Sequence, residues 1–252
     1  RWESIPMSPS GNCPDRQQEM LVKAIESGRF SRSDRHLPGL YRIGNGLGMM
    51  NAGHIFNTDA TDAKSLSDAY AAGRTLVREY LDFYREYIPG CEGMQLVSTA
   101  PLLGIRESRR IVGEYVLDYD DYKARRRFDD GIGLCSGKVD IHVYDDSPEE
   151  YERYYAEFNE IDHLAVGESF AIPYRSLIPA GSRNLWVAGR CISSDVKVQG
   201  ALRVQPTCMV MGEAAGTAAW LALSRSPGRV ETMRVDSAAL RRQLLDDGAI
   251  LD

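Results

Sequence analysis

The sequence is poor in clustered positive charge and in long hydrophobic runs. Its formal net charge is −6, so no sustained basic surface is available for nucleic acid or an anionic membrane. The only dense basic clusters, RESRR at 106–110 and KARRR at 123–127, are short, and acidic residues flank the second. No apolar run approaches the roughly 18 residues that span a bilayer. We therefore expect a soluble protein with no nucleic-acid or membrane partner.

Paired cysteines are also missing. The five cysteines are an odd number, and none stands in a C-x-x-C motif or at paired spacing with histidine. This pattern is typical of reduced thiols in a cytoplasm-like compartment and carries no zinc signature. We expect a cytoplasmic protein with no metal site. The cysteines are Cys13, Cys91, Cys135, Cys191 and Cys208.

The chain begins with Arg1 rather than methionine. This start indicates that the N-terminus was made by processing or cutting, or that upstream sequence is missing. The 252 residues, 43% of them hydrophobic, are enough for a packed core in one large domain or two small ones.

Hydrophobic spacing predicts a mixed fold of the α/β (α+β) class. Helices are expected at 14–30, 65–88, about 206–224 and 235–251, with a loop or helix at 147–160. Strands are expected at 94–105, 110–119, 137–145 and 184–190, and a strand and turn at 39–56. The strands suggest a mixed or antiparallel sheet.

Two helices carry more detailed expectations. Thr61, Ser65 or Ser67 is available to cap the helix at 65–88, and Pro89-Gly90 is its stop signal. In the C-terminal helix, the residues expected to face inward are Leu240, Leu244 and Leu245.

The stretch GALRVQPTCMVMGEAAGTAA at 200–219 gives up most of its side-chain volume. Pro206 suits the first turn of a helix, where the leading N–H groups have no intrahelical acceptor and attract negative charge. Gly212 and Gly216 would let this helix approach a strand or a cofactor closely. An ordinary, tightly packed helix explains the same composition.

The segment NLWVAGRCISSDVKVQGALRVQPTCMVMGEAAGTAA resembles the C-terminal signature of the FAD-dependent oxidoreductases of the glutathione-reductase-like superfamily, in particular a large bacterial group. The resemblance continues through ATDAKSLSDAYAAGR, LLGIRESRRIVGEYVL and IPYRSLIPAG and covers most of residues 57–222. It implies FAD as cofactor and a partial FAD/NAD(P)-binding fold. It also implies three regions: a substrate or cap region at 1–175, a strand and helix of the FAD domain at 176–224, and a packing helix at 225–252.

The resemblance also implies which residues lie near the flavin. In that group the strand ending in VAGR lies along the ribityl and diphosphate groups, and the next helix points its start at the pyrimidine edge of the ring. Reduction makes that edge negative, which free N–H groups would stabilise. The residues matched to these positions are Gly189, Arg190, Cys191, Arg203, Pro206, Thr207, Cys208 and Met209.

One part of the family pattern is absent. Complete members begin with a strand and a G-x-G-x-x-G turn that holds the FAD diphosphate, and GNGLGM at 44–49 does not have that spacing. We interpret GNGLGM as a turn. A second polypeptide or a missing N-terminal segment is therefore expected to supply the Rossmann half, and the chain to be a fragment or one part of a hetero-oligomer.

His142 is the candidate base, because a histidine can accept the proton when a hydroxyl or amine loses hydride. Arg106 and Arg109 are candidates to clamp a polar substrate group, and Tyr174 is placed near the cofactor by the resemblance. Structural roles remain open for all four. Cys208, at a helix start, is expected to have a lowered pKa, although its backbone N–H is expected to matter more.

These features predict a flavoenzyme that takes hydride from a small polar substrate to flavin N5 when its Rossmann half is present. A non-catalytic assembly subunit is the alternative. A cysteine hydrolase that uses Cys208 and His142 is less favoured, because no oxyanion or nucleophile-elbow motif accompanies the thiol.

Overall fold

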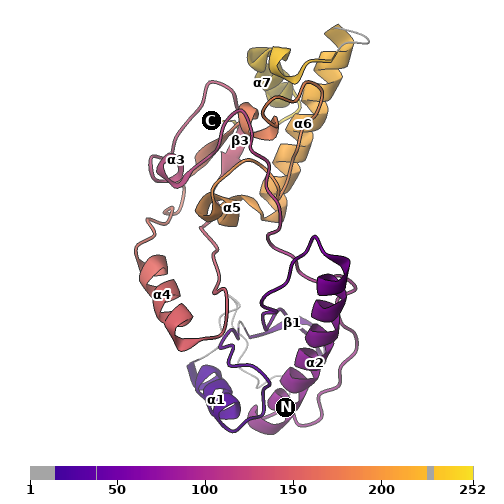
Figure 1. Cartoon of the computed structure of the whole chain (residues 1–252), viewed down its shortest axis with the longest axis vertical. Helices are drawn as coiled ribbons and strands as arrows, with labels where there is room; N and C mark the ends of the chain where they lie inside the picture. The colour runs from indigo at the N-terminus through magenta and orange to yellow at the C-terminus, as the bar shows by residue number, and fades with distance from the viewer. Residues whose placement is uncertain (1–14, 38, 226–229, 252) are drawn as a thin grey trace. The chain divides into compact units, whose positions relative to one another are not determined.

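The computed structural model describes residues 15–37, 39–225 and 230–251, and these form two compact units. Unit 1 comprises the described residues of Arg1–Ile105 and Val143–Tyr155, and unit 2 those of Arg106–His142 and Ala156–Asp252. The elements are mixed helices and short antiparallel strands (Figure 1), which confirms the predicted fold class. The domain boundaries at residues 175 and 224 stay a prediction, and Cys13 lies outside the described residues.

Unit 1 contains a helical pair and a hairpin. Helix α1 spans Asp15–Glu26 and helix α2 spans Ala63–Tyr87, while strands β1 (Leu40–Gly44) and β2 (Leu47–Met50) pair antiparallel. The predicted helices and the turn at GNGL are confirmed. The hydrophobic core between α1 and α2 includes Leu21, Ala24, Leu76, Tyr80, Phe83 and Tyr84.

The N-cap of α2 differs from the expected residues. Asp62 caps the helix, since its carboxylate accepts a hydrogen bond of 2.6 Å from the amide of Ser65. An aspartate in extended backbone satisfies one of the leading N–H groups as well as serine or threonine does. The helix ends as predicted just before Pro89, with Ile88 as its C-cap.

Unit 2 is built around a two-stranded antiparallel sheet, β3 (Gly131–Cys135) with β4 (Phe170–Pro173). Helix α6 packs on β3 at Gly133, where an added Cβ would collide with the side chain of Val210. The close approach of helix and strand therefore depends on this glycine. The remaining elements are α3 (Tyr119–Lys123), α4 (Pro148–Asn159, shared with unit 1), η2 (Tyr174–Leu177), α5 (Val196–Leu202), α6 (Gln205–Arg225), η3 (Thr232–Arg234) and α7 (Ser237–Asp246).

Four predicted strands are wrong. The segments 94–105, 110–119, 137–145 and 184–190 are irregular, apart from single bridges of Gly113 with Pro179 and Leu117 with Ser194. In 137–145 the burial still alternates in part, with Val139 and Val143 buried and Asp140 and Tyr144 exposed. Alternation reports which side chains are buried, whereas a strand also needs a neighbouring backbone to pair with.

The C-terminal helices follow the prediction closely. Helices α6 and α7 lie against each other in unit 2 (Figure 1). Leu240 and Leu244 are buried as expected, but Leu245 is 49% exposed, so its inward assignment is wrong. Among the described helices, none combines the length and the apolar character that crossing a membrane requires.

Candidate functional site

Unit 2 gathers three basic side chains around Asp140. The carboxylate of Asp140 lies 3.0 Å from Nη2 of Arg203, 3.1 Å from Nε2 of His142 and 3.9 Å from Nη1 of Arg106. Arg106 also contacts Nε2 of His142 directly. The structure thus brings the predicted residues Arg106, His142 and Arg203 together. We call Arg106, Asp140, His142 and Arg203 the polar cluster.

Local structure explains how Arg203 reaches this cluster. Arg203 is the C-cap of α5, and Asp195 caps the start of that helix by accepting a 2.8 Å hydrogen bond from the amide of Val198. Where α5 passes the chain before His142, Gly200 has no Cβ, and one built there would lie 3.1 Å from the backbone of Asp140. The short, capped helix therefore fixes the guanidinium, which is 9% exposed, against Asp140.

The cationic side chains of the polar cluster stabilise the charge of Asp140, while the charge of Arg106 opposes that of Arg203. Burial alone would raise the pKa of Asp140, but the hydrogen bond with His142 and the charges of His142, Arg203 and Arg106 outweigh it and lower the pKa to about 2. Burial lowers the pKa of Arg203, and the charge of Asp140 opposes this effect. Asp140 is therefore a fixed anion at neutral pH that can stabilise positive charge on His142.

Gln199 joins the polar cluster to the segment that the sequence predicted to lie near the flavin. This side chain is 2% exposed. Its amide nitrogen donates to the backbone oxygen of Arg106 at 3.0 Å and to that of Arg190 at 3.4 Å. Sequence reasoning missed Gln199, because one glutamine in VKVQGAL gives no chemical signal. The buried side chain of Gln199 thus bonds both to Arg106, a predicted catalytic residue, and to Arg190, a predicted cofactor-binding residue.

The segment after VAGR forms a tight turn beside the start of α6. Gly189 has a φ of +90°, which favours glycine, and its oxygen accepts from the amide of Ile192 at 3.1 Å. A Cβ at this position would lie 4.0 Å from Sγ of Cys208. Cys191 lies within the turn, and its thiol donates to the oxygen of Ala188 at 3.7 Å.

The start of α6 differs in part from the expectation. The amide of Cys208 donates to the oxygen of Val204 at 3.0 Å, so it is already used within the helix, and the prediction that it is unpaired is wrong. The amides of Gln205 and Thr207 precede this bond, and among the described residues neither has a hydrogen-bond acceptor. Pro206, between them, has no N–H. Thr207 was therefore among the predicted donors, and Gln205, two residues before it, was not.

The predicted reactivity of Cys208 is also wrong. Burial raises the pKa of its thiol, the charge of Arg190 opposes this shift only in part, and Cys191 adds to it. Burial therefore outweighs the favourable effect of a helix start on a thiolate. A raised pKa weakens the reading of Cys208 as the nucleophile of a hydrolase.

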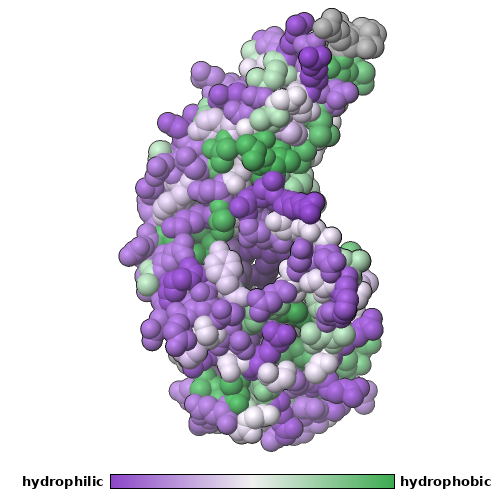
Figure 2. Space-filling model, in the orientation of Figure 1, coloured by the Kyte–Doolittle hydropathy of each residue, from purple (hydrophilic) through white to green (hydrophobic). Residues whose placement is uncertain are grey.

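The glycine face of α6 is open. Gly212 and Gly216 are exposed, and among the described residues no atom lies within 4 Å of a Cβ built on either. The helix packs inward instead through Met211, Ala214 and Ala218. Met209, near the start of α6, is 70% exposed, and Figure 2 shows hydrophobic residues on the visible face of unit 2.

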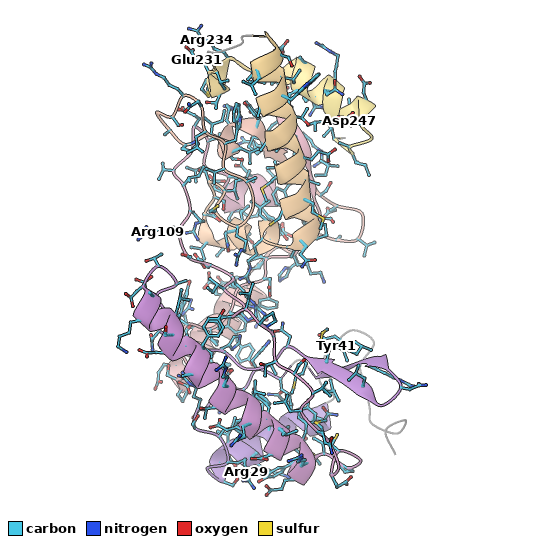
Figure 3. The ribbon with its side chains drawn as sticks, turned by 90° about the vertical axis from the view of Figure 1, so that its right-hand side faces the viewer. Arg29, Tyr41, Arg109, Glu231, Arg234 and Asp247 are labelled. Carbon is cyan, nitrogen blue, oxygen red and sulfur yellow. The ribbon has the colours of Figure 1, made fainter. Side chains whose placement is uncertain are left out.

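Arg109 and Tyr174 are the other two predicted catalytic residues. Arg109 is exposed and lies at the edge of the ribbon in Figure 3. Tyr174 is buried; its hydroxyl donates to the oxygen of Thr232 at 2.9 Å and accepts from Nε1 of Trp186 at 2.6 Å. Burial raises the pKa of Tyr174 to about 12. Both bonds of this hydroxyl go to groups inside unit 2.

Unit 1 holds a separate buried carboxylate. Asp34 is 4% exposed and accepts hydrogen bonds from the amides of His36 and His54 and from the hydroxyl of Tyr151, at 3.0, 2.7 and 2.9 Å. Burial would raise its pKa, but the hydrogen bonds and charge of His54, with the amide of His36, lower it overall. No sequence motif singles out Asp34.

Unit 2 thus brings together a mixed α/β fold, a glycine turn beside the start of α6, and the polar cluster. The family model described as FAD dependent oxidoreductase matches residues 8–244, so the chain belongs to that family. No curated protein and no solved structure matches the chain.

FAD is the cofactor of this family, and residues of unit 2 fit it. The amides of Gln205 and Thr207 are the kind of donor that a flavin ring edge, negative on reduction, would accept. Gly189 gives close backbone approach beside them. The donors and the turn fit the flavin better than a neutral apolar ligand, which could accept neither N–H.

Proposed function

We propose that the chain oxidises a small polar substrate with FAD. When bound, FAD supplies the acceptor, flavin N5, for the hydride that leaves a substrate C–H bond. Gly189, Arg190 and Cys191 would line the ribityl and phosphate groups, and the amides of Gln205 and Thr207 would face the ring. The observation that supports this best is the link through Gln199, whose side chain joins the backbones of Arg106 and Arg190.

His142 is the proposed proton acceptor. Its Nε2 contacts the Arg106 guanidinium and lies 3.1 Å from Oδ1 of Asp140. In the neutral ring this nitrogen accepts from Arg106, and in the protonated ring it donates to Asp140. Each protonation state therefore has a partner in place. The proton comes from the substrate hydroxyl or amine, so the substrate loses one hydride and one proton.

Arg106 is the proposed substrate-binding residue. The guanidinium of Arg106 contacts Nε2 of His142 through Nη1, so its remaining N–H groups can donate to an oxygen of the substrate before the proton moves. Arg203 keeps its contact with Asp140 and holds the carboxylate in position. Arg109, which is exposed, is proposed as a second cation for a carboxylate or similar substrate group.

We further propose that a G-x-G-x-x-G segment outside these residues completes the FAD site, either on a second polypeptide or on a preceding part of the same protein. The open face of α6 at Gly212 and Gly216 supports this, because small exposed residues leave room for a closely packed neighbour.

The test uses the complete flavin-containing assembly and the variant His142→Gln. If His142 accepts the proton, kcat falls by about 10²–10⁴-fold, the dependence of kcat on its ionisation disappears, and flavin content stays the same. His163→Gln, which changes a histidine outside the polar cluster, is the matched control and should retain activity. Unchanged turnover in His142→Gln and in Arg203→Ala would contradict the proposal and support a non-catalytic assembly subunit.

A further inference from the structure

Two histidines of unit 1 lie side by side although they are distant in the sequence. The rings of His36 and His54 have centroids 4.4 Å apart and planes inclined at 32°. One ring nitrogen of each lies within 4.8 Å of the other. The sequence predicted no metal site, because these residues have no recognised ligand spacing. Their proximity arises only from the fold of the loops before and after the β1–β2 hairpin.

The ring of His54 is oriented by a carboxylate. Nδ1 of His54 lies 3.2 Å from Oδ1 of Asp34. With the hydrogen on Nδ1, this nitrogen donates to Asp34, and Nε2 keeps its lone pair on the opposite side of the ring. Histidines that bind metals almost always donate their second nitrogen in this way, which fixes the tautomer and raises the basicity of the ligand.

The carboxylate that orients His54 is itself held firmly. Asp34 accepts from the hydroxyl of Tyr151 at 2.9 Å, and that hydroxyl accepts from the amide of Arg35 at 2.8 Å. The amides of His36 and His54 also donate to Asp34. The buried carboxylate of Asp34 therefore holds the backbone of both histidines in place.

We propose that His36 and His54 bind a divalent transition-metal ion of the kind that prefers imidazole nitrogen, such as zinc or nickel, with water as the remaining ligands. Both side chains are partly exposed, that of His54 by 17%, so an ion can reach them from solvent. Asp34 is a positioning residue and supplies negative charge behind the site. The proposal does not depend on the flavin or on the polar cluster.

The test is isothermal titration of the metal-stripped protein with Ni²⁺. Nickel is chosen because imidazole suits it, whereas zinc is also drawn to thiolates, and this chain has five cysteines. We expect the wild type to bind one Ni²⁺ at this site, His36→Gln and His54→Gln to lose that binding, and His163→Gln to keep it. Asp34→Asn should bind about 10–100-fold more weakly.

Circular dichroism of each variant checks that it folds. If His54→Gln does not fold, His36→Gln alone tests whether the histidines bind the ion. This variant is expected to fold, because its backbone amide can still donate to Asp34. The proposal is overturned if the wild type binds no Ni²⁺ in this titration. It is equally overturned if folded His36→Gln binds the ion as tightly as the wild type does.

Discussion

Adding a single methyl group at Gly137 tests how closely α5 packs against the segment that carries Asp140. Gly137 precedes this segment, and a Cβ built on it would lie 2.5 Å from the backbone oxygen of Ala201 in α5. An ordinary contact begins at 3.4 Å, so Gly137→Ala must move the helix or the segment by about 0.9 Å. A backbone oxygen cannot rotate away as the end of a long side chain can.

Overpacking of this kind costs about 1–3 kcal/mol of unfolding free energy. The matched control is Gly212→Ala on α6, because the site is exposed and a Cβ there meets no described atom within 4 Å. An alanine in a helix interior is more stable than a glycine by roughly 0.5–1 kcal/mol. The same chemical change is therefore expected to have opposite signs at the two positions.

Urea unfolding followed by far-ultraviolet circular dichroism measures both changes. The unfolding midpoint should fall for Gly137→Ala and rise for Gly212→Ala, and Gly137→Ala should also lower activity because Asp140 and His142 follow it in the chain. A Gly137→Ala protein as stable as the wild type would refute the described packing of α5. A less stable Gly212→Ala protein would refute the open face of α6 in the isolated chain.

Three further predictions concern buried or paired polar groups. The pKa of Asp140 is about 2 in the folded protein against an ordinary 3.8. The stability that this carboxylate contributes is therefore complete above pH 3.8 and lost as the pH falls through 2. The free energy of unfolding, measured at a series of acidic pH values, should show this loss in the wild type and not in Asp140→Asn. Gln199→Leu removes the donor to the backbone oxygens of Arg106 and Arg190, and should lower the unfolding free energy by about 0.5–1.5 kcal/mol and weaken flavin retention, measured as absorbance after gel filtration. Tyr174→Phe removes the partner of the Trp186 indole and of the Thr232 carbonyl, and should cost a similar amount in thermal unfolding; unchanged stability would show that this hydroxyl is not structural.

Helices could be predicted from the sequence because their signals are local. The apolar repeat and the stop before Pro89 define α2 within a few residues, and the proline near the start of α6 marks that helix equally well. The strand predictions at 94–105 and 137–145 are wrong, because strand pairing depends on which distant backbone lies alongside. In 137–145 buried valines still alternate in part with exposed polar side chains, although no strand forms there.

The site was predicted in its residue types but not in its contacts. His142 and Arg106 were singled out by chemistry, while their contact and the role of Asp140 depend on the chain's path in three dimensions. Gln199 has no signature because its partners are backbone oxygens at positions 106 and 190. The pKa of Cys208 was predicted with the wrong sign, because burial, which sequence does not show, outweighs the helix start.

The central claim is that this chain forms one wall of an FAD site in which Gln199 joins the flavin-facing turn to the polar cluster. The most direct measurement is the visible absorbance spectrum of the purified native assembly, with the polypeptides identified by mass spectrometry. The account predicts bound flavin and a G-x-G-x-x-G sequence in the same particle. A colourless assembly that also fails to take up added FAD would contradict it.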